Sequence, residues 1–401
     1  MNRIAFRLSL AQAAAGAIGG ASLPFFGAWL AWKGLSPTEI GTILSSGMLL
    51  RVFVMPVTGI VADARNDRRG MMLFLCCAMT LGFAALNRVS LPLLIFLAAV
   101  PANVAVGAAT PLLESVSMRL ADRFGFDYGH VRLFASASFV AGNILSGILV
   151  SIFGLIVIAP WLFVSGALNV AAVYALPAPP RDRPRGDFLL RMQATFAEAR
   201  ELLRSRVFLV FLAAASLDQG SHAFYYGYGG LHWLALGYPG WLISAIWPLG
   251  VLAEIAFMFF SLRIFKALGA VRLLALGALS CIVRWAILAL DPPLPFVIFA
   301  QLLHGGTFAL AHLGAMYFIL KAVPSRLAAT AQSVYGVCSS GLALGLATYA
   351  CGPLYAIAGG RTYLLMSAMG LGALFFVLWL GRAWAGGRII AGGSEEDLAM
   401  I

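Results

Sequence analysis

Twelve long apolar stretches dominate this sequence and decide which class of protein it can form. They lie near residues 8–32, 38–62, 71–88, 91–118, 131–153, 155–176, 206–234, 240–264, 271–290, 294–319, 328–356 and 362–384. A hydrocarbon core of roughly 30 Å requires about 20 helical residues to cross it. Because 61% of the residues are hydrophobic and only 11% are charged, a soluble globule would lack polar residues to cover its surface. The sequence therefore predicts an all-α membrane protein with twelve transmembrane helices.

The basic residues are distributed unevenly between alternate loops. Of the 27 Lys and Arg residues, 22 fall on one side of the predicted membrane and 3 on the other, while Arg51 and Arg284 lie inside spans. Basic residues concentrate in cytoplasmic loops. We therefore expect a protein of the bacterial inner membrane with both termini on the cytoplasmic side. Short basic loops also explain the net charge of +11, and no nucleic-acid partner is expected.

The chain is predicted to divide into two halves of six helices. Residues 177–185 are rich in Pro and Arg and form a linker that continues into a short amphipathic stretch. The predicted parts are an N-terminal bundle at 1–176, a cytoplasmic linker at 177–205, a C-terminal bundle at 206–385 and a cytoplasmic tail at 386–401. Paired halves with a substrate site between them are a general architecture of secondary transporters. One chain suffices for it, so we expect a monomer.

Cofactor and enzyme chemistry have little support in the sequence. The five cysteines lie in apolar stretches without metal-ligand spacing and are expected to be buried packing residues. Neither a nucleotide-binding signature nor a catalytic constellation is found. We expect no cofactor, no metal and no enzymatic activity, and energy for transport would come from ion gradients.

A small set of ionisable residues lies within the predicted spans. A charge at mid-bilayer costs at least about 2.5 kcal/mol, so each calls for a partner or a function. The set comprises Arg51, Glu114, Asp218, His222, Glu254, Arg284, His304 and His312, joined by Arg132 at the start of the fifth span. These residues are the first candidates for binding a substrate or a proton.

The loop after the second span resembles the cytoplasmic signature of the major facilitator superfamily. The signature consists of a Gly, an acid and a basic pair, and these correspond to Gly59, Asp63 and the pair that begins at Arg68. Asn66 stands where the family usually has Gly. Asn tolerates a left-handed backbone, so the turn is expected to survive. The second-half loop at 263–269 is degenerate, because Phe265 replaces an acid or amide. Ordinary positive-inside charge is the alternative explanation for both loops.

The segment 127–134, with Glu114 upstream, resembles the lactose permease branch of that superfamily. Glu114 and Arg132 are 18 residues apart on antiparallel spans, so they are expected to face each other across the hairpin. The resemblance implies that this pair holds a substrate. The match is incomplete, since Thr307 stands where the lactose permease has its proton-carrying Glu. Another group must then carry any proton.

A closer resemblance, over nearly the whole chain, is to the bacterial 3-phenylpropionate permease group. It is carried by the segments 23–25, 51–53, 127–134, 220–227, 249–254, 284–285 and 304–313. The resemblance implies a secondary active transporter that takes up a small organic acid, such as an aromatic carboxylate, together with a proton by alternating access. The alternatives are proton symport of a sugar or nucleoside, and efflux of hydrophobic compounds.

Roles follow for the individual residues. The substrate-binding candidates are Arg51, Glu114, Arg132, His222, Tyr225, Tyr226 and Arg284, and the proton-coupling candidates are Glu254, Asp218, His304 and His312. Glu254 comes first because its apolar setting favours a protonated carboxyl. His304 and His312, at i and i+8, are expected to share one helix face.

Each of these roles has a structural alternative. Arg51 and Arg284 can each be locked to an acid of the same bundle, and Glu254 can form a fixed salt bridge with Arg284. The histidines can be hydrogen-bonded packing residues, and the tyrosines can belong to the interfacial aromatic belt.

Overall fold

A computed structural model describes residues 3–177 and 188–390, and every regular element in these two ranges is helical. The first elements are α1 (Arg3–Trp32), α2 (Pro37–Ala64), α3 (Arg68–Leu86), α4 (Pro92–Phe124), α5 (Tyr128–Phe153), the 3-10 turn η1 (Leu155–Val157) and α6 (Ile158–Tyr174). They are followed by α7 (Phe188–Leu203), α8 (Arg206–Gly220), α9 (Ala223–Ala235), α10 (Gly240–Phe259), α11 (Ser261–Leu288) and α12 (Leu294–Leu302). The last are η2 (Gly305–Leu310), α13 (Ala311–Ala322), η3 (Ser325–Leu327), α14 (Ala328–Gly336), η4 (Val337–Ala343), α15 (Leu344–Ala358), η5 (Gly359–Thr362) and α16 (Tyr363–Ala383).

The apolar helices account for the predicted spans. Within the described residues, eleven helical stretches are long and apolar enough to cross a bilayer. The last of them, Ser325–Ala383, has 59 residues. Since about 20 residues suffice for one crossing, and the 3-10 turn η5 divides this stretch before α16, it provides two crossings. The prediction of twelve transmembrane helices is therefore confirmed.

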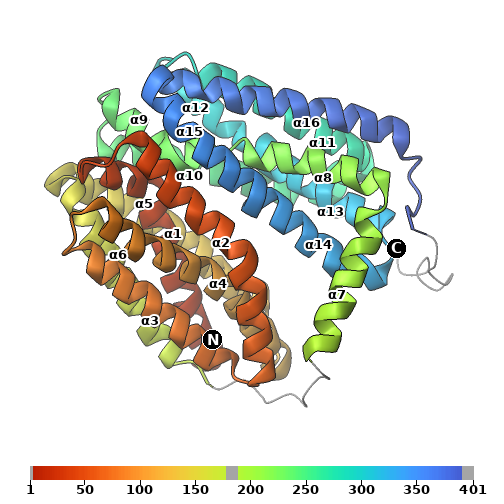
Figure 1. The fold of residues 1–401 in the computed structure, drawn as a ribbon, viewed down its shortest axis with the longest axis horizontal. Helices are drawn as coiled ribbons and strands as arrows, with labels where there is room; N and C mark the ends of the chain where they lie inside the picture. The colour runs from red at the N-terminus through yellow and green to blue at the C-terminus, as the bar shows by residue number, and fades with distance from the viewer. Residues whose placement is uncertain (1–2, 178–187, 391–401) are drawn as a thin grey trace. The chain divides into compact units, whose positions relative to one another are not determined.

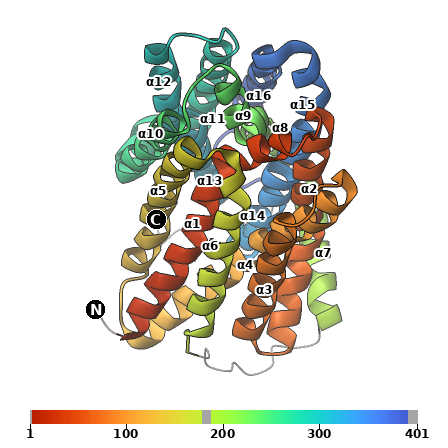
Figure 2. The ribbon, with the colours of Figure 1, turned by 90° about the vertical axis from the view of Figure 1, so that its left-hand side faces the viewer.

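The contacts group the chain into two units, which we call the first and the second unit. The first unit contains the described residues up to 177 together with Tyr225–Pro248 and Thr348–Ala356. The second contains the described residues 188–224, Leu249–Ala347 and 357–390. Inside the first unit α6 packs on both α1 and α3 (Figure 2). Inside the second unit α8, α11 and α16 pack against one another (Figure 1). The predicted boundaries at 176 and 206 stay a prediction, and residues 178–187 and 391–401 of the predicted linker and tail lie outside the described ranges.

Three of the predicted spans are interrupted, which their hydropathy does not show. The seventh is divided into α8 and α9 by Ser221 and His222. The tenth and eleventh contain the π-helical segments η2 and η4. Breaks and π segments leave main-chain groups outside the regular hydrogen-bond ladder and are common at functional sites. They direct attention to the second unit.

Small residues bring helices of the first unit close together. A methyl group added at Gly27 would meet the main-chain oxygen of Gly227, and one added at Gly230 would meet that of Pro24. Lipid removes the difference in solvation that drives apolar helices together in water, so close backbone packing stabilises such contacts instead. Glycine at these positions allows α9 to lie directly on α1.

Aromatic rings fill the core of the second unit. Phe211 is fully buried and stacks on Phe318 with ring centroids 4.2 Å apart. Phe208 and Tyr335 pack beside this pair at 5.8 and 6.0 Å from Phe211. Rings of this size make many dispersion contacts, and they fix α8 against α13 and α14.

The predicted amphipathic stretch after the linker forms α7. Its Glu201 accepts two hydrogen bonds from Arg326 at 3.1 and 2.6 Å, and its Glu198 accepts one from Thr330. The hydrogen bonds from Arg326 hold the pKa of Glu201 below its usual range. These contacts attach one face of α7 to the beginning of the eleventh span.

The cysteines only partly follow the prediction. Cys76, Cys281 and Cys351 are buried and Cys338 is half-buried, but Cys77 is exposed. Successive helical residues point about 100° apart, so Cys77 cannot share the inward direction of Cys76 on α3. For Cys77 the prediction of a buried packing residue was wrong.

Candidate functional site

Arg284 lies at the centre of a buried polar cluster in the second unit. Its Nη1 donates to Nδ1 of His304 at 2.8 Å and to Oγ1 of Thr307 at 3.1 Å, and its Nη2 donates to Oε1 of Gln301 at 2.9 Å. The side chain is fully buried, although arginine belongs to the residue types that are almost never fully buried unless paired. The acceptors at Gln301, His304 and Thr307 fix the orientation of the guanidinium plane.

The cluster forms where two spans are interrupted. His222 occupies the turn between α8 and α9, and His304 directly precedes η2. Nε2 of His222 lies 3.0 Å from Oγ1 of Thr307, and its Nδ1 lies 3.3 Å from the main-chain oxygen of Gln219. The rings of His222 and His304 are 5.5 Å apart. The two interruptions therefore bring both histidines into the cluster around Arg284.

Aromatic rings enclose the cluster. The guanidinium of Arg284 lies 4.3 Å from the ring centroid of Trp285, which stacks on Tyr363 at 5.6 Å. Phe308 stacks between His304 and His312, with centroids 5.5 and 6.2 Å away. The expectation that His304 and His312 share a face is met by this column of three rings. Phe308 was not predicted as a site residue, although its position midway between the two histidines was a usable signal.

Asp218 lies near the end of α8, just before the break at Ser221 and His222, and its contacts differ from those of the two histidines. The thiol of Cys281 donates to its Oδ1 at 3.4 Å, and Ser221 Oγ donates to its main-chain oxygen at 2.6 Å. Indole Nε1 of Trp285 donates to Ser221 Oγ at 3.0 Å. Asp218 is thus joined to the Arg284 cluster through one serine and one tryptophan.

Glu254 lies on α10, the helix that covers this cluster. A methyl group added at Gly250 would lie 3.0 Å from Cβ of His304, and one added at Gly305 would lie 3.1 Å from the main-chain oxygen of Ala253. Glu254 follows Gly250 by one turn and is half-buried. Its proton-coupling role stays a prediction.

Glu114 and Arg132 form a second polar group, in the first unit. Arg132 Nε lies 2.9 Å from Oε1 of Glu114, which confirms that the two residues face each other across the hairpin. The hydroxyl of Tyr128 donates to Glu114, and the amide of Gln12 lies 3.5 Å from Glu114 and 3.2 Å from Ser117. This group is partly exposed, and Tyr128 and Gln12 were not predicted to join it.

Arg51 was expected to bind a substrate or to pair with an acid of the same bundle, but its partner in the structure is a main-chain oxygen. Its Nε and Nη2 donate to the main-chain oxygen of Asn103 at 3.1 and 2.8 Å. Its side chain also packs where Gly107 leaves room on α4. The Asn103 side chain donates to the main-chain oxygen of Ala99 at 2.9 Å. Arg51 is therefore held by a backbone carbonyl rather than by an acid in these contacts.

Tyr225 and Tyr226 lie on the part of α9 that belongs to the first unit. Tyr225 is buried and stacks on Trp247 with centroids 4.2 Å apart, and Trp233 meets both rings edge-on. Tyr226 is half-buried at 5.6 Å from Tyr225. Trp247 covers one face of the Tyr225 ring, and the substrate-binding roles of Tyr225 and Tyr226 stay a prediction.

The signature loop has the expected backbone. Asn66 has a φ of 49°, so it adopts the left-handed conformation predicted for the position of the family's Gly. Asp63 forms an ion pair with Arg68 at 2.6 Å, and Arg68 also contacts Ser115 on α4. A methyl group added at Gly59 would meet no atom within 4 Å. In the second loop, Phe265 stacks on Tyr317 with ring centroids 3.6 Å apart.

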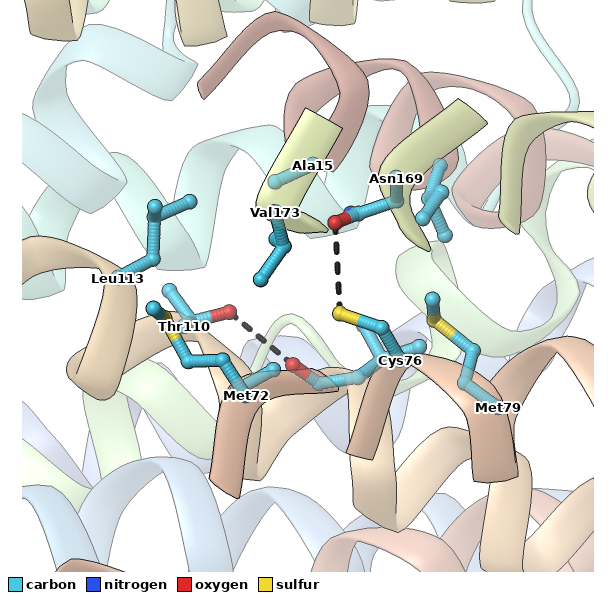
Figure 3. A pocket seen from close by; sticks show the side chains of 11 residues that line it. Ala15, Met72, Cys76, Met79, Thr110, Leu113, Asn169 and Val173 are labelled. Atoms are coloured by element: carbon cyan, nitrogen blue, oxygen red, sulfur yellow. Dashed lines mark hydrogen bonds between the residues drawn. The ribbon is translucent and has the colours of Figure 1, made fainter. Parts of the chain in front are cut away.

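A small cavity lies inside the first unit, among α1, α3, α4 and α6 (Figure 3). Its lining is mostly apolar and includes Ala15, Met72, Met79, Leu113 and Val173. Its polar members are Thr110, Cys76 and Asn169, and the thiol of Cys76 donates to Asn169 at 3.4 Å. It contains none of the residues predicted for a site. No group of three potential metal ligands is found in the ranges 3–177 and 188–390.

Comparisons with known proteins agree with this architecture. The family model described as the MFS_1 like family matches residues 15–365. The "Probable 3-phenylpropionic acid transporter" of Escherichia coli K12 is 32% identical over 360 residues, covering 89% of this chain and 92% of that protein. The maltose permease of Geobacillus stearothermophilus is 30% identical and covers 80% of each chain.

A solved structure confirms the fold. The crystal structure of the nucleoside transporter NupG matches with a TM-score of 0.81 at 18% sequence identity, covering 95% of this chain and 100% of that one. Together with the membrane-spanning helices, these matches show a multi-pass membrane transporter and not an enzyme. The chain belongs to the MFS_1-like family of major facilitator transporters.

Proposed function

We propose that the protein takes up a small organic acid, such as an aromatic carboxylate, together with a proton. The observation that carries this proposal is the environment of Arg284, which is buried, oriented by three side-chain acceptors and stacked on an indole ring. A planar guanidinium binds a carboxylate through two parallel hydrogen bonds. The rings of Trp285 and Phe308 make the surroundings of Arg284 aromatic and apolar, which suits the ring of an aromatic acid.

The relatives support an acid as the substrate. The bacterial protein with 32% identity is named for 3-phenylpropionic acid, which combines a carboxylate and a phenyl ring. The interrupted spans around His222 and His304 match the general arrangement in which broken helices surround a transporter's substrate. An aromatic acid would meet both a guanidinium and stacked rings in this cluster.

Proton coupling accounts for the remaining titratable groups. Asp218, Glu254, His304 and His312 lie in the spans without forming part of a metal or nucleotide site within the described residues. One proton moving inward gains about 2.3 kcal/mol per 100 mV and about 1.4 kcal/mol per pH unit. That is sufficient to concentrate an organic acid. The distribution of basic residues supports an inner-membrane protein with cytoplasmic termini, and one chain with both halves can work as a monomer.

A sugar or nucleoside is the second candidate substrate. It is favoured by the polar group at Glu114, Arg132, Tyr128 and Gln12, which offers several donors and acceptors to hydroxyl groups. The 30% identity to a maltose permease points the same way. On this alternative the substrate would contact the first unit, and Arg284 would be a structural residue.

Uptake into proteoliposomes distinguishes the two candidates. The purified protein is reconstituted, an acid-outside pH gradient is imposed, and radiolabelled 3-phenylpropionate, maltose and uridine are compared. We expect gradient-driven accumulation of 3-phenylpropionate alone. Because hydrogen bonds to charged groups contribute about 1.5–3 kcal/mol, Arg284→Gln should lower apparent affinity roughly 10- to 150-fold.

The matched control is Arg361→Gln, which removes an exposed arginine in the turn η5. It should leave the affinity for 3-phenylpropionate within about twofold, since exposed charges contribute little. Accumulation of maltose or uridine, with no response to 3-phenylpropionate, would transfer the proposal to the Glu114 group. If Arg284→Gln binds 3-phenylpropionate with the affinity of wild type, Arg284 does not bind the substrate.

A further inference from the structure

We infer that Asp218 is the residue that binds and releases the coupled proton, and that Cys281 and Ser221 link its protonation to the occupancy of Arg284. This inference rests on the proposed function. Asp218 is 3% exposed. Its Oδ1 accepts one hydrogen bond, from the thiol of Cys281, and its Oδ2 has no hydrogen-bond partner among the residues the structure describes.

The contacts of Asp218 favour a neutral acid. A thiol is a weak donor, and Lys, Arg and His form no ion pair with Asp218 within the described part of the chain. An ionised carboxylate at this depth would lose its hydration and gain only one weak hydrogen bond in return. The protonated form is therefore the stable one in this conformation.

The other titratable groups around Asp218 come from each helix that packs on α8. They are Cys281 and Arg284 on α11, Cys338 on η4, Tyr335 on α14, Tyr363 on α16, His304 and His312 on either side of η2, and His222 in the following turn, while Glu198 and Glu201 on α7 adjoin the opposite end of α8. Cys281 is the one that contacts the carboxyl directly. Arg284 is three residues beyond Cys281 on α11, and it forms no ion pair with Asp218 in the described ranges.

A chain of hydrogen bonds connects the proton site with the proposed carboxylate site. Trp285, on which Arg284 stacks, donates to Ser221 at 3.0 Å. Ser221 donates to the main-chain oxygen of Asp218 at 2.6 Å and lies 3.3 Å from the Cys281 sulfur. An anion that moves the guanidinium would therefore disturb Trp285, Ser221 and the donor to Asp218 in turn.

The backbone next to Asp218 lies at the interruption of the seventh span. α8 ends at Gly220, two residues after Asp218, and a methyl group added at Gly220 would lie 3.2 Å from Ala343 at the end of η4. The proton site thus lies between a helix break and a π-helical segment. On release, the O–H bond of the acid breaks, the proton passes to water on the acceptor side, and Asp218 remains as a carboxylate.

The test compares Asp218→Asn with Asp122→Asn, which neutralises an exposed acid near the end of α4, in proteoliposomes. Two assays use 3-phenylpropionate: accumulation driven by an acid-outside pH gradient, and exchange of labelled for unlabelled substrate without a gradient. We expect Asp218→Asn to lose gradient-driven accumulation at least tenfold while exchange stays within about twofold of wild type, and Asp122→Asn to keep both. Proton uptake per substrate, followed with an internal pH dye, should fall to zero only in Asp218→Asn.

Opposite results have different meanings. If Asp218→Asn accumulates 3-phenylpropionate like wild type, or if Asp122→Asn loses accumulation to the same extent as Asp218→Asn, the inference is overturned. If the wild-type protein neither accumulates nor exchanges the acid, the proposed function itself fails. The two failures are thereby separated.

A pair of milder variants protects the test against misfolding. Cys281→Ser places a stronger donor beside the carboxylate, and Cys281→Ala removes the donor. The pH of half-maximal uptake should move to lower pH in Cys281→Ser and to higher pH in Cys281→Ala. Identical profiles for wild type and both variants would overturn the inference even if Asp218→Asn does not reach the membrane.

Discussion

Replacing Gly230 by alanine tests whether close backbone packing holds α9 against α1. The added Cβ would overlap with the main-chain oxygen of Pro24 and would lie 2.8 Å from its carbonyl carbon. Non-bonded carbon atoms prefer separations of about 3.5–4.0 Å. Both contacting atoms belong to the backbone, so no change of rotamer can relieve the overlap and the helices must separate by roughly 1 Å.

The expected magnitude follows from two opposing terms. Overpacking of this kind costs about 1–3 kcal/mol, whereas replacing Gly by Ala in a helix gains up to about 1 kcal/mol. Gly336→Ala in α14 is the control that changes helix propensity without overpacking, because a methyl group there would meet no atom within 4 Å. Gly230→Ala should therefore be less stable than Gly336→Ala by about 1–3 kcal/mol, a factor of roughly 5 to 150 in the packing equilibrium.

The assay is thermal unfolding of both purified variants in one detergent, followed by intrinsic tryptophan fluorescence, with uptake rates measured in parallel. We expect a lower midpoint and slower uptake for Gly230→Ala and a midpoint at or above that of wild type for Gly336→Ala. Equal midpoints and rates in the two variants would show that α9 and α1 do not depend on this contact.

Three further predictions concern other parts of the chain. Asp63→Asn should slow 3-phenylpropionate uptake without changing its apparent affinity, because it removes the ion-pair partner of Arg68 in a loop outside the buried cluster; a changed affinity would contradict this. Phe308→Ala should weaken 3-phenylpropionate severalfold more than an aliphatic acid in competition assays, since it removes a stacking surface; equal weakening would argue against aromatic contact. The protection of α7 amides against hydrogen exchange, relative to the intrinsic exchange rate at each pH, should be constant at neutral pH and fall only below the ordinary pKa of about 4.3 for Glu. A carboxyl whose pKa is lowered by Arg326 contributes stability above that range and loses it as pH falls, so Glu201→Gln should abolish the pH dependence.

The spans were predictable from the sequence because the bilayer imposes one physical requirement on all of them. About 20 apolar residues are needed for each crossing, and the sequence displays this without reference to tertiary contacts. The left-handed turn at Asn66 and the helix α7 were predictable for local reasons, since turn chemistry and amphipathicity are properties of a few neighbouring residues. The hairpin pair Glu114–Arg132 followed from the antiparallel order of adjacent spans.

The interruptions and the partners of buried groups were not predictable in this way. A break at Ser221–His222 or a π segment leaves hydropathy unchanged, so nothing in the apolar pattern marks it. Gln301 is uncharged and passes unnoticed in a search for buried charges, yet it orients Arg284. Arg51 was expected to seek an acid or a substrate, but its structural partner is a main-chain oxygen, which every residue possesses and no sequence pattern reveals.

The π-helical segment η2 has a consequence for the comparison of related sequences. Each π hydrogen bond encloses one residue more than an α-helical one, so deleting a single residue from Gly305–Leu310 would restore a continuous α-helix in the tenth span. Gaps in alignments usually mark surface loops. Here a one-residue gap would instead rotate His304 and Thr307 relative to His312. Relatives that lack that residue are expected to present a different set of side chains to Arg284, and therefore to transport different substrates.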